Sequence, residues 1–411
     1  MSDQDLQKIQ TLQFTDIDAA NKLLKAFFQS NLPFEVETVN VRPLAVSLNS
    51  INGFLTTGDG KKLFFKTHVE PQSIIHEYYN SSILAEAGYP VIQPIFSSTE
   101  WGKQLLIYEF FDSPSLFNVA RELETGQRQD LEQVVSIQQQ ADEELREIYL
   151  KTLQQLEAKE HASAPIHQLF YHRLTGGRFN SFYQGKNIIL PTEQINFDNL
   201  AQMQWVINGV KFQDTLDELV QLATKLLNPS RGKVPSIVGH GDAHNGNVFI
   251  DTEQASIIYF DPAFAGRHSP LLDLTKPLFH NVFAIWMYFP REIASILSIK
   301  LEITNNTLVV EHDFAPTTVR VAFLKSKLHR VLKPILKELK SRVWLATDWR
   351  EYLKLALFCC PFLTMNLSDT QRFPPEITLL GLAISMEMGS RGQNSLKTLL
   401  DQELDTIAAQ L

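Results

Sequence analysis

Residues 240–247, H-G-D-A-H-N-G-N, constrain this chain more than any other part of its sequence. Asp242 stands five residues before Asn247, and the strand-like run 255–260 then leads into a second carboxylate, Asp261, followed by proline. Phosphoryl transfer uses one carboxylate to orient an acceptor hydroxyl and take its proton, and amide and carboxylate oxygens to hold Mg²⁺. The alternative is a polar turn with a histidine buried for packing, which leaves the strand and its terminal aspartate unexplained.

The pattern H-G-D-x-H-x-x-N, followed by a strand and Asp-Pro, resembles the aminoglycoside phosphotransferase and choline kinase family, a small-molecule branch of the protein-kinase-like fold. The resemblance covers residues 40–280 by motif and the helical remainder by pattern. It implies a two-lobed α+β fold. A small β-rich lobe over residues 1–110 would bind nucleotide, and a larger, mainly helical lobe over residues 111–411 would carry the catalytic loop and the acceptor pocket.

The same resemblance assigns roles to residues of the motif. Asp242 is the expected catalytic base, and Asn247 and Asp261 are the expected ligands of Mg²⁺, with ATP as the co-substrate. Hydrogen bonds that support the loop are expected from His240, His244 and Asp273. Because Asp242 already fills the role of base, the two histidines are not expected to transfer protons.

Short β-type runs follow a helical pattern over residues 10–32. The runs are Phe34–Val39, Gly53–Thr57 and Lys62–His68, and Gly58-Asp59-Gly60 predicts a hairpin turn between the last two. Lys66 therefore lies on a strand among phenylalanines, where a buried charge needs an anionic partner.

That partner is expected on the helical pattern Ser73–Ala87, which Gly88 stops. The resemblance gives Lys66 to the α- and β-phosphates of ATP and Glu77 to the ion pair that positions it. The alternatives are a lysine that snorkels from an edge strand and a glutamate on the solvated face of a helix.

Two further segments are expected to contact the nucleotide. An apolar strand ends in a charged break, where the resemblance places the hinge that reads the adenine edge, at Glu109 and Phe111. The loop that covers the phosphates is expected over residues 47–53, where Ser50 and Asn52 offer hydrogen-bonding groups. This loop departs from the pattern G-x-G-x-x-G, and taken alone it is an ordinary hairpin loop.

Beyond the hinge the pattern is mainly helical. An apolar stripe over residues 127–160 predicts a packed helix with a solvated face. Further helices are expected over residues 320–345, 350–365 and 376–389. Arg173 and Arg178 flank a glycine break and either bind an anionic acceptor or are surface arginines. The spacing of His161, His167 and His172 is too irregular to predict a metal site.

Composition excludes several classes of function. A chain of 411 residues is too long for one compact core, and the net charge of -9 argues against a nucleic-acid-binding surface. Cys359 and Cys360 are adjacent within an apolar helical stretch and predict buried thiols rather than a disulfide. Neither an apolar signal core nor a membrane-length apolar run is found, so we expect a reducing cytoplasmic setting without membrane contact.

The expected reaction is transfer of the γ-phosphoryl group of ATP to the hydroxyl of a small molecule. Only eight residues, Pro262 to Ser269, separate Asp261 from Pro270, and the helical pattern resumes at Leu271–Asp273. This leaves no room for a long peptide-docking segment of the protein-kinase type. A catalytically weak ATP-binding regulatory protein is one alternative, although such a protein would normally lack one of the three motif residues. Nucleotidyl transfer on the same fold is another. The identity of the acceptor, the preference for ATP or GTP and the oligomeric state stay open.

Overall fold

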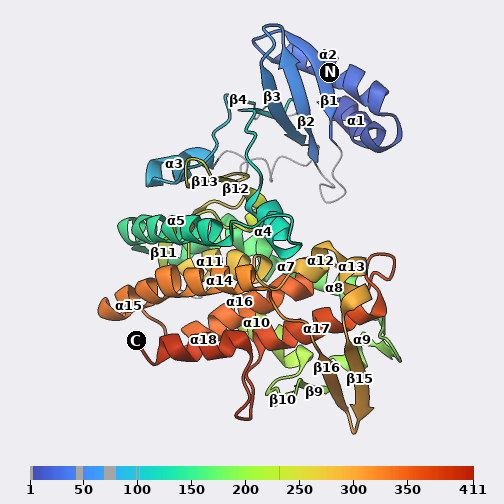
Figure 1. The fold of residues 1–411 in the computed structure, drawn as a ribbon, viewed down its shortest axis with the longest axis vertical. Coiled ribbons are helices and arrows are strands. Elements are labelled where there is room, and N and C mark those ends of the chain that lie inside the picture. The colour runs from blue at the N-terminus through green and yellow to red at the C-terminus, as the bar shows by residue number, and fades with distance from the viewer. Residues whose placement is uncertain (1–2, 43–49, 69–79, 99, 101, 231) are drawn as a thin grey trace.

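The computed structural model describes residues 3–42, 50–68, 80–98, 100, 102–230 and 232–411. A small N-terminal lobe is stacked on a larger lobe along the long axis of the molecule (Figure 1). Each lobe has its own core, because the buried apolar side chains form one cluster between Leu6 and Ile107 and another between Leu84 and Ile407. The expected α+β architecture, with a small β-rich lobe and a larger, mainly helical lobe, is confirmed.

The small lobe contains a five-stranded antiparallel sheet of order β1-β2-β3-β5-β4. Its strands are β1 (Val36–Val41), β2 (Ser50–Thr57), β3 (Lys62–His68), β4 (Phe96–Ser98) and β5 (Leu105–Glu109). The predicted hairpin joins β2 to β3, and Gly60 adopts the left-handed φ of +85° that suits such a turn. The predicted strands are confirmed, although β1 lies two residues further along the chain than its pattern indicated.

The single helix expected over residues 10–32 is wrong, because two helices share this segment. They are α1 (Asp3–Thr15) and α2 (Ile17–Asn31), and Asp16 lies between them. The Asp16 carboxylate accepts a hydrogen bond from the Ala19 N–H at 3.0 Å, and such an N-cap starts a new helix. Buried Phe27 and Phe28 of α2 then pack in the core of the small lobe with Phe65 of β3.

Strand alternation sends two sets of side chains to opposite faces of the small sheet. Leu63 and Phe65 of β3 belong to the core with α1 and α2, so Phe64 and Lys66 face the other way. Strand pairing extends this second face into two rows, one of Asn52, Lys66 and Leu106 and one of Phe54, Phe64 and Tyr108. The face that α1 and α2 leave uncovered therefore carries a mixed polar row beside an aromatic row.

The larger lobe is built mainly from helices, and α16 packs against both α11 and α17. The helices are α3 (Ser81–Ala87), α4 (Leu116–Glu124), α5 (Leu131–Thr152), α6 (Ala158–Ala162), α7 (Tyr171–Thr175), α8 (Arg178–Tyr183), α9 (Phe197–Leu200), α10 (Leu216–Leu226), α11 (Pro270–His280), α12 (Ile285–Tyr288), α13 (Pro290–Ile296), α14 (Thr318–Ser326), α15 (Lys333–Ser341), α16 (Trp349–Leu363), α17 (Pro375–Gly389) and α18 (Leu399–Ala408). Short 3₁₀ turns cover Pro165–Leu169 and Asn245–Asn247, and a π-helical turn, Lys327–Leu332, joins α14 to α15.

Small sheets complete the larger lobe. Their orders are β10-β9-β16-β15, β14-β11-β6, β12-β13 and β7-β8. The strands are β6 (Gln154–Leu156), β7 (Asn187–Ile189), β8 (Gln194–Asn196), β9 (Gln204–Ile207), β10 (Val210–Lys211), β11 (Val234–Gly239), β12 (Val248–Asp251), β13 (Ser256–Tyr259), β14 (Gly266–His268), β15 (Ile299–Thr304) and β16 (Thr307–His312).

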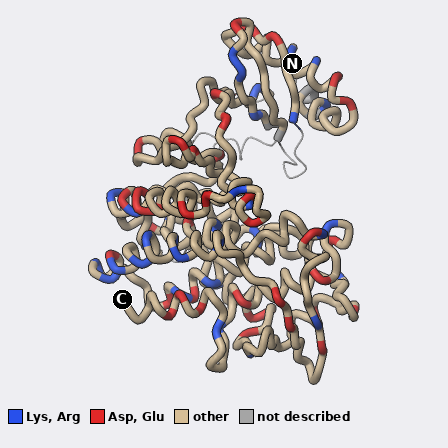
Figure 2. The backbone as a smooth tube through the Cα atoms, viewed as in Figure 1, with Lys and Arg blue, Asp and Glu red and all other residues tan. Residues whose placement is uncertain are grey.

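The long helix expected over residues 127–160 is shorter than predicted. It is α5, which ends at Thr152, because the following residues form β6 and pair with β11. The Thr152 hydroxyl accepts a hydrogen bond from the Val238 N–H at 3.1 Å, which anchors this change from helix to strand. Charged residues recur along α5 (Figure 2), and Glu132, Glu144, Glu147 and Lys151 are exposed, so its predicted solvated face is confirmed.

The other predicted helices lie close to their expected bounds. α14, the π-helical turn and α15 span residues 318–341, α16 spans 349–363 and α17 spans 375–389. Cys359 and Cys360 are both buried in α16 without a disulfide, as predicted. The helix expected over Ser73–Ala87 appears as α3, which Gly88 stops with a φ of +107°, and residues 73–79 lie outside the described residues. Within the described ranges, every helix is too short or too polar to traverse a lipid bilayer.

The chain passes between the lobes more than once before α4. Residues 80–92 belong to the larger lobe, where the Tyr89 hydroxyl donates to the Val238 carbonyl at 3.0 Å. Pro90 and Ile92 form backbone hydrogen bonds with both polar groups of Tyr259, at 2.7 and 2.9 Å. The chain then returns to the small lobe as β4 and β5 and leaves it again after Glu109. Several segments of the polypeptide, not one linker, therefore connect the two lobes.

His167 is a buried histidine that makes stability depend on pH. Its side chain is 1% exposed, and Nε2 donates to the His161 carbonyl at 2.8 Å. Burial first, and the neighbouring His161 second, lower the pKa of His167 to about 3. Below pH 6.5 the unfolded chain binds a proton that folded His167 does not accept, so stability falls as the pH falls. From pH 7 to pH 5 this histidine should remove about 2 kcal/mol.

We predict that His167→Gln makes the free energy of unfolding less sensitive to pH by about 2 kcal/mol over this range. The Gln amide can still donate to the His161 carbonyl but cannot titrate. Urea denaturation at pH 7 and pH 5 measures the difference, and His172→Gln, on the exposed side of α7, is the matched control. The same pH dependence in His167→Gln and wild-type protein would contradict the prediction.

Candidate active site

A two-stranded hairpin brings the amide and the carboxylate of the motif to one place. β12 and β13 pair antiparallel with Val248 opposite Tyr259, so Asn247, just before β12, and Asp261, just after β13, lie at the same end. The Phe260 N–H donates to the Asn247 carbonyl at 2.9 Å and closes this end. The register of the hairpin therefore places both side chains together.

The loop of residues 240–247 folds back on one of its own carbonyl groups. The Asp242 carbonyl accepts hydrogen bonds from the His244 N–H at 2.8 Å and from the Asn247 side-chain amide at 3.0 Å. Because the nitrogen of this amide is used inside the loop, its oxygen is the atom left to bind a ligand. The His244 ring accepts a hydrogen bond from the Gly246 N–H at 3.1 Å and adds a second internal contact.

Asp273 supports the loop of residues 240–247 and bonds to two other parts of the chain, β14 and α5. One carboxylate oxygen accepts from the Gly241 N–H at 2.6 Å and from the His268 ring at 2.8 Å. The other oxygen accepts from the Tyr149 hydroxyl of α5. Burial raises the pKa of Asp273, but hydrogen bonding and the charge of His268 together with the Tyr149 bond outweigh it, so the pKa lies below its usual value.

Two glycines are required by this close packing. A Cβ on Gly239 would lie 2.5 Å from the Asp273 carboxylate, and a Cβ on Gly241 would lie 2.5 Å from the Phe264 carbonyl. Gly241 also has a left-handed φ of +81°. These glycines let the end of β11 approach the carboxylate that orients the loop.

His240 connects the loop to the segment that carries Asp261. Its Nε2 donates to the Phe260 carbonyl at 2.9 Å, and its Nδ1 accepts from the Asp242 N–H at 3.3 Å. The ring is fully buried, and this burial lowers the pKa of His240 despite the carboxylates nearby. His240 is therefore a neutral side chain whose two nitrogens are both used for support.

Asp242 is a largely enclosed carboxylate with an unused oxygen. Its side chain is 18% exposed, and Oδ1 makes no hydrogen bond to any described residue, although Lys276 Nζ lies 3.7 Å away. Burial raises the pKa of Asp242, but the positive charge of Lys276, followed by His244 and Arg173, brings it below the usual value. Asp242 is therefore ionised at neutral pH, and its Oδ1 is an unbonded acceptor enclosed beside Lys276.

Lys276 and His280 were not recognised in the sequence. Both are almost fully buried on α11, with Lys276 Nζ 3.4 Å from His280 Nε2 and His280 Nδ1 2.9 Å from the Tyr288 hydroxyl. Burial, then the charge of Lys276, lowers the pKa of His280 well below its usual value and keeps it neutral. A signal was present, because Asp273, Lys276 and His280 follow at spacings of three and four on one helical face.

Lys66 reaches across from the small lobe to Asp261. Its Nζ lies 2.7 Å from Asp261 Oδ1, and only 9% of the residue is exposed. Glu77, the expected partner of Lys66, lies outside the described residues. The described carboxylate that Lys66 contacts is thus one of the two expected metal ligands.

Part of the loop expected over residues 47–53 is strand, because β2 begins at Ser50. Ser50 is the first residue of β2 and Asn52 lies inside that strand, so these two residues are not in a loop. The pairing of β2 with β3 through Ser50 and His68 extends the sheet by three residues beyond the predicted start. Asn52 is 6% exposed and lies directly opposite Lys66, whereas residues 47–49 lie outside the described residues.

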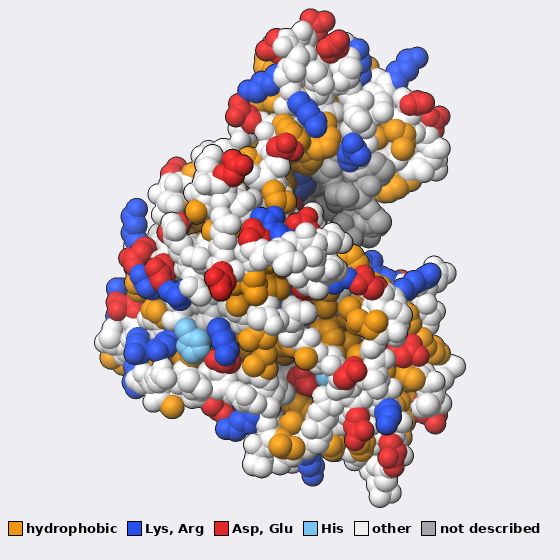
Figure 3. Space-filling view, viewed as in Figure 1, with side chains coloured by type: hydrophobic (Ala, Val, Ile, Leu, Met, Phe, Trp, Pro, Cys, Tyr) orange, Lys and Arg blue, Asp and Glu red, His pale blue; other side chains and the backbone are white. Residues whose placement is uncertain are grey.

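An aromatic cavity of about 180 Å³ lies where the chain passes from β5 to α4. Its lining contains the two expected hinge residues and a set of apolar side chains from both lobes: Phe54, Phe64, Ile92, Tyr108, Glu109, Phe110, Phe111, Phe249 and Phe260. The Glu109 carboxylate forms an ion pair with Lys61 at 2.6 Å and is mostly exposed. The outline of the molecule narrows between the two lobes (Figure 3).

Most residues of the aromatic cavity were missed in the sequence. The alternation of β3 contains the signal for Phe64, which must share a face with Lys66. Phe260 comes from the larger lobe and lies 5.8 Å from Phe64 and 5.1 Å from Tyr108, measured between ring centroids. Its place in the cavity depends on how the lobes meet, and strand patterns do not contain that information.

Arg173 and Arg178 both reach the C-terminal end of α16. Arg173 is half-buried and donates to the Thr364 hydroxyl at 3.2 Å, and exposed Arg178 donates to the Leu363 carbonyl at 3.2 Å. Burial and the charge of Arg178 lower the pKa of Arg173 to about 10, and Arg173 in turn lowers the pKa of Asp242. Arg178 therefore caps a helix end, while Arg173 also contributes charge to the site.

The oxygen donors of the site suit a hard divalent cation. Asn247 offers an amide oxygen and Asp261 a carboxylate, which is the type of ligand that Mg²⁺ prefers. In the described part of the chain, no group of three or more His, Cys, Asp or Glu side chains could hold a metal ion. His161 and His167, in particular, bond to backbone carbonyls, as expected for packing histidines.

No family model and no curated protein matches this chain. Similar solved structures include a macrolide 2'-phosphotransferase type I, with 12% identity, a TM-score of 0.45 and coverage of 89% of this chain and 97% of the other. The chain is similar to small-molecule phosphotransferases. A thermostable mutant of an aminoglycoside phosphotransferase, solved with AMP-PNP and hygromycin B, has 11% identity, a TM-score of 0.44 and coverage of 89% and 95%.

A Plasmodium vivax ethanolamine kinase gives a similar match, with 11% identity, a TM-score of 0.39 and coverage of 84% and 81%. These proteins belong to the class that the motif around Asp242 resembles. Because every one of these TM-scores is below 0.5, we infer the function of this chain from the geometry of its site.

Asp261 is held in a strained backbone conformation. Its φ is +56°, in the left-handed region, and it precedes Pro262, which disfavours helical conformations in the residue before it. Such strain costs about 1–3 kcal/mol and is concentrated at functional sites. The backbone strain at Asp261 therefore lowers the stability of the fold at the residue whose carboxylate contacts Lys66.

We predict that Asp261→Gly is more stable than Asp261→Ala by about 1 kcal/mol, because both lose the carboxylate but only glycine adopts this φ without strain. Urea denaturation of the two variants measures the difference. Asp251 lies in β12 of the same hairpin, where glycine should be the less stable of the two substitutions. Equal stability of the Asp261 variants would show that the backbone is not strained there.

Proposed function

We propose that this chain is an ATP-dependent phosphotransferase that acts on the hydroxyl of a small molecule. Residues 1–110 would bind the nucleotide, and residues 111–411 would carry the catalytic loop and the acceptor pocket. The observation that supports this most is a continuous set of contacts: Asp242 bonds to Asn247, Asn247 to the residue before Asp261, and Asp261 to Lys66. These contacts support a site in which the proposed base, the two proposed oxygen ligands and the proposed phosphate-binding lysine act together.

Asp242 is the proposed base. Its carboxylate, 18% exposed, would accept the proton of the acceptor hydroxyl and so orient the oxygen toward the γ-phosphorus. Lys276 Nζ lies 3.7 Å from the enclosed Oδ1 and stabilises the ionised carboxylate. His240 and His244 bond to backbone groups of the loop and are proposed to support it. Asp273 is proposed to orient the loop through Gly241.

Asn247 and Asp261 are the proposed ligands of Mg²⁺. When bound, the cation supplies positive charge to the phosphate oxygens of ATP. Asn247 contributes an amide oxygen whose direction is set by the bond of its nitrogen to the Asp242 carbonyl. Asp261 contributes a carboxylate that already contacts Lys66, and binding of phosphates would give this lysine a second anionic partner.

The nucleotide is proposed to lie between the lobes, with its base in the aromatic cavity. Rings such as Phe64, Tyr108 and Phe260 offer faces on which a purine can stack, and the backbone groups of Glu109 and Phe111 offer hydrogen bonds to its edge. Lys66 would contact the phosphates, with Ser50 and Asn52 nearby on β2. Glu77 stays the proposed partner that positions Lys66.

A small acceptor suits the segment after Asp261. Residues 266–268 form β14 and pair with β11, and α11 begins at Pro270, so little free chain is present where a peptide could dock. Arg173 is proposed to bind an anionic group of the acceptor, because it is half-buried and forms no ion pair with any described residue. Arg178 is a weaker candidate for this role, since it is exposed and caps α16.

We predict that Asp242→Asn lowers phosphoryl transfer by about 10²–10⁴-fold and leaves the affinity for Mg-ATP within a few-fold. The purified protein is screened with ATP against hydroxyl-bearing metabolites, and ADP release is measured for each. Asp251→Asn, on the adjacent hairpin, is the matched control. More than a tenth of wild-type turnover in Asp242→Asn would exclude this base. Release of pyrophosphate in place of ADP would indicate nucleotidyl transfer. Nucleotide binding without turnover would indicate a regulatory protein.

We predict that Asp261→Gly weakens ATP binding at least about tenfold with Mg²⁺ present and much less without it, because the lost ligand is an oxygen for a hard cation. Glycine suits the φ of +56°, so this variant should stay folded. Calorimetric titration with ATP, with and without Mg²⁺, measures the effect, and Asp251→Gly is the control. An equal loss under both conditions would exclude Asp261 as a metal ligand.

A further inference from the structure

The larger lobe contains a second cavity that is separate from the proposed active site. Its volume is about 730 Å³, within the range of cavities that bind small molecules. It lies between the sheet of β9, β10, β15 and β16 and the helices α17 and α18, at the end of the lobe far from the small lobe (Figure 1). Neither the catalytic loop nor Arg173, Lys276 or Asp261 contributes to its lining.

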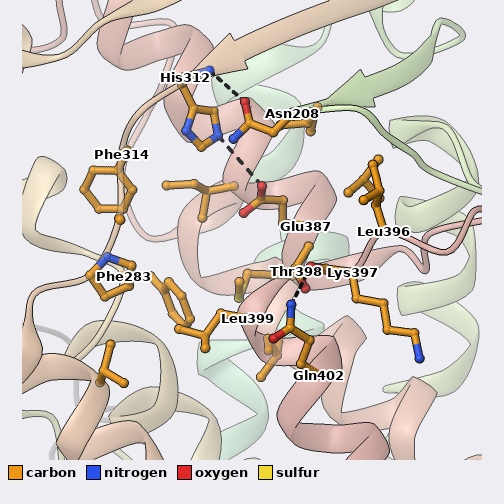
Figure 4. Close-up of a pocket in the computed structure, with 18 of the residues that line it drawn as sticks. Asn208, Phe283, His312, Phe314, Glu387, Leu396, Lys397, Thr398, Leu399 and Gln402 are labelled. Carbon is orange, nitrogen blue, oxygen red and sulfur yellow. Dashed lines mark hydrogen bonds and ion pairs between the residues drawn. The ribbon is translucent and has the colours of Figure 1, made fainter.

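One side of this distal cavity is apolar. Phe283, Phe314, Ile384, Met388 and Leu399 line it, and in Figure 4 the rings of Phe283 and Phe314 lie on the same side as Leu399. Leu396, from the connection between α17 and α18, also lines the cavity and is 51% exposed. Leu396 therefore lies where the cavity opens to solvent, and an apolar ligand in the cavity would cover part of its side chain.

The other side of the cavity carries Glu387 and His312, whose side chains lack hydrogen-bond partners among the described residues. The His312 side chain is 3% exposed, and neither ring nitrogen makes a hydrogen bond to a described residue. Its closest charged neighbour is Glu387 Oε1, 3.8 Å from Nε2, which is too long for a hydrogen bond. The two side chains point toward each other in Figure 4. Unbonded buried nitrogens are unfavourable and uncommon, so a bonding partner is expected in the cavity.

The surrounding residues that the structure describes hold His312 and Glu387 in place, but they do not bond to the His312 ring or to the Glu387 carboxylate. The Asn208 side chain accepts a hydrogen bond from the backbone N–H of His312 at 2.8 Å, so it holds the strand and not the ring. Lys354 donates to the backbone carbonyl of Glu387 at 3.1 Å and pairs with Asp401, so its charge is used elsewhere. Lys397 extends away from the cavity in Figure 4 and pairs with Asp405.

The chemistry of the ligand follows from these groups. Glu387 is the only acid in the lining that the structure describes, and no lysine or arginine of the described residues neutralises its carboxylate. A group that donates hydrogen bonds and carries positive charge would satisfy this carboxylate, and the imidazole can accept or donate to the same group. The apolar wall requires a hydrocarbon or aromatic body beside that charged end.

We propose that the distal cavity binds an amphiphilic amine, with its ammonium group between Glu387 and His312 and its apolar body against Phe283, Phe314 and Leu399. This site is independent of the proposed phosphotransferase function, because it shares no residue with that site. Binding there needs neither nucleotide nor metal.

The test uses three probes of one shape: 4-phenylbutylamine, 4-phenylbutan-1-ol and 4-phenylbutyrate. Dissociation constants are measured by calorimetry on the full chain without nucleotide at pH 7. The amine should bind at least about tenfold more tightly than the alcohol, and the butyrate most weakly. No saturable binding of the amine, or butyrate binding as tight as the amine, would overturn the proposal.

Two variants and a control locate the binding. Glu387→Gln should raise the dissociation constant of the amine at least about tenfold, while that of the alcohol should change by less than about threefold. Leu396→Trp, at the exposed edge, should narrow the entrance of the distal cavity and so weaken the binding of the amine and of the alcohol to the same degree. Glu311→Gln changes an exposed carboxylate one residue from His312 and should alter neither.

The controls separate this proposal from that for the active site. Melting temperatures check that each variant is folded, and Leu396→Trp tests the location even if Glu387→Gln is unstable. Unchanged amine binding in both cavity variants would overturn the proposal. Asp242→Asn should bind the amine as the wild type does, and loss of amine binding in this variant would contradict a separate site. The amine result and the phosphotransfer result can therefore fail independently.

Discussion

The arrangement of the proposed active site depends on the buried carboxylate of Asp273. This one side chain bonds to the backbone of the catalytic loop at Gly241, to His268 of β14 and to Tyr149 of α5. A buried carboxylate without such partners would be protonated or would destabilise the fold, so these contacts must form together. The absence of a Cβ at Gly239 makes this packing possible. The position of Asp242 is therefore set by groups that come from four separate elements.

The charges around Asp242 are balanced by keeping the histidines neutral. Burial lowers the pKa values of His240, His244 and His280, while Lys276 remains the nearest cation. Neutral rings can bond to backbone groups and support the loop without competing with the carboxylate for a proton. This separation leaves Asp242 as the ionised side chain of the loop, which is the form that the proposed reaction needs.

The parts of the site that are local in sequence could be predicted, and those that depend on long-range packing could not. The motif itself contains Asp242 and Asn247, and the pairing of β12 with β13 is a short hairpin, so the position of Asp261 followed from the pattern. Strand alternation also placed Lys66 on the uncovered face of its sheet. By contrast, the contact of Lys66 with Asp261 joins two lobes, and no local pattern contains it.

The same limit explains the errors in secondary structure. α5 stops at Thr152 because β11 recruits the next residues into a sheet, although their own pattern is helical. The boundary between α1 and α2 was easier to predict from the sequence, because Asp16 is a good N-cap. It was missed because the helical spacing of apolar residues continues through Asp16. The aromatic cavity and the cluster of Lys276 and His280 required knowledge of which helix faces which strand.

The repeated passage of the chain between the lobes has a consequence for any attempt to study them apart. Residues 90–92 lie early in the sequence, yet their backbone pairs with Tyr259 of β13, two residues before Asp261. A fragment that begins after the hinge would lack this segment and would expose the edge of the hairpin that carries both proposed metal ligands. A recombinant larger lobe would therefore need residues 80–92 supplied as a separate peptide, and reassembly of the two pieces would report on the hairpin directly.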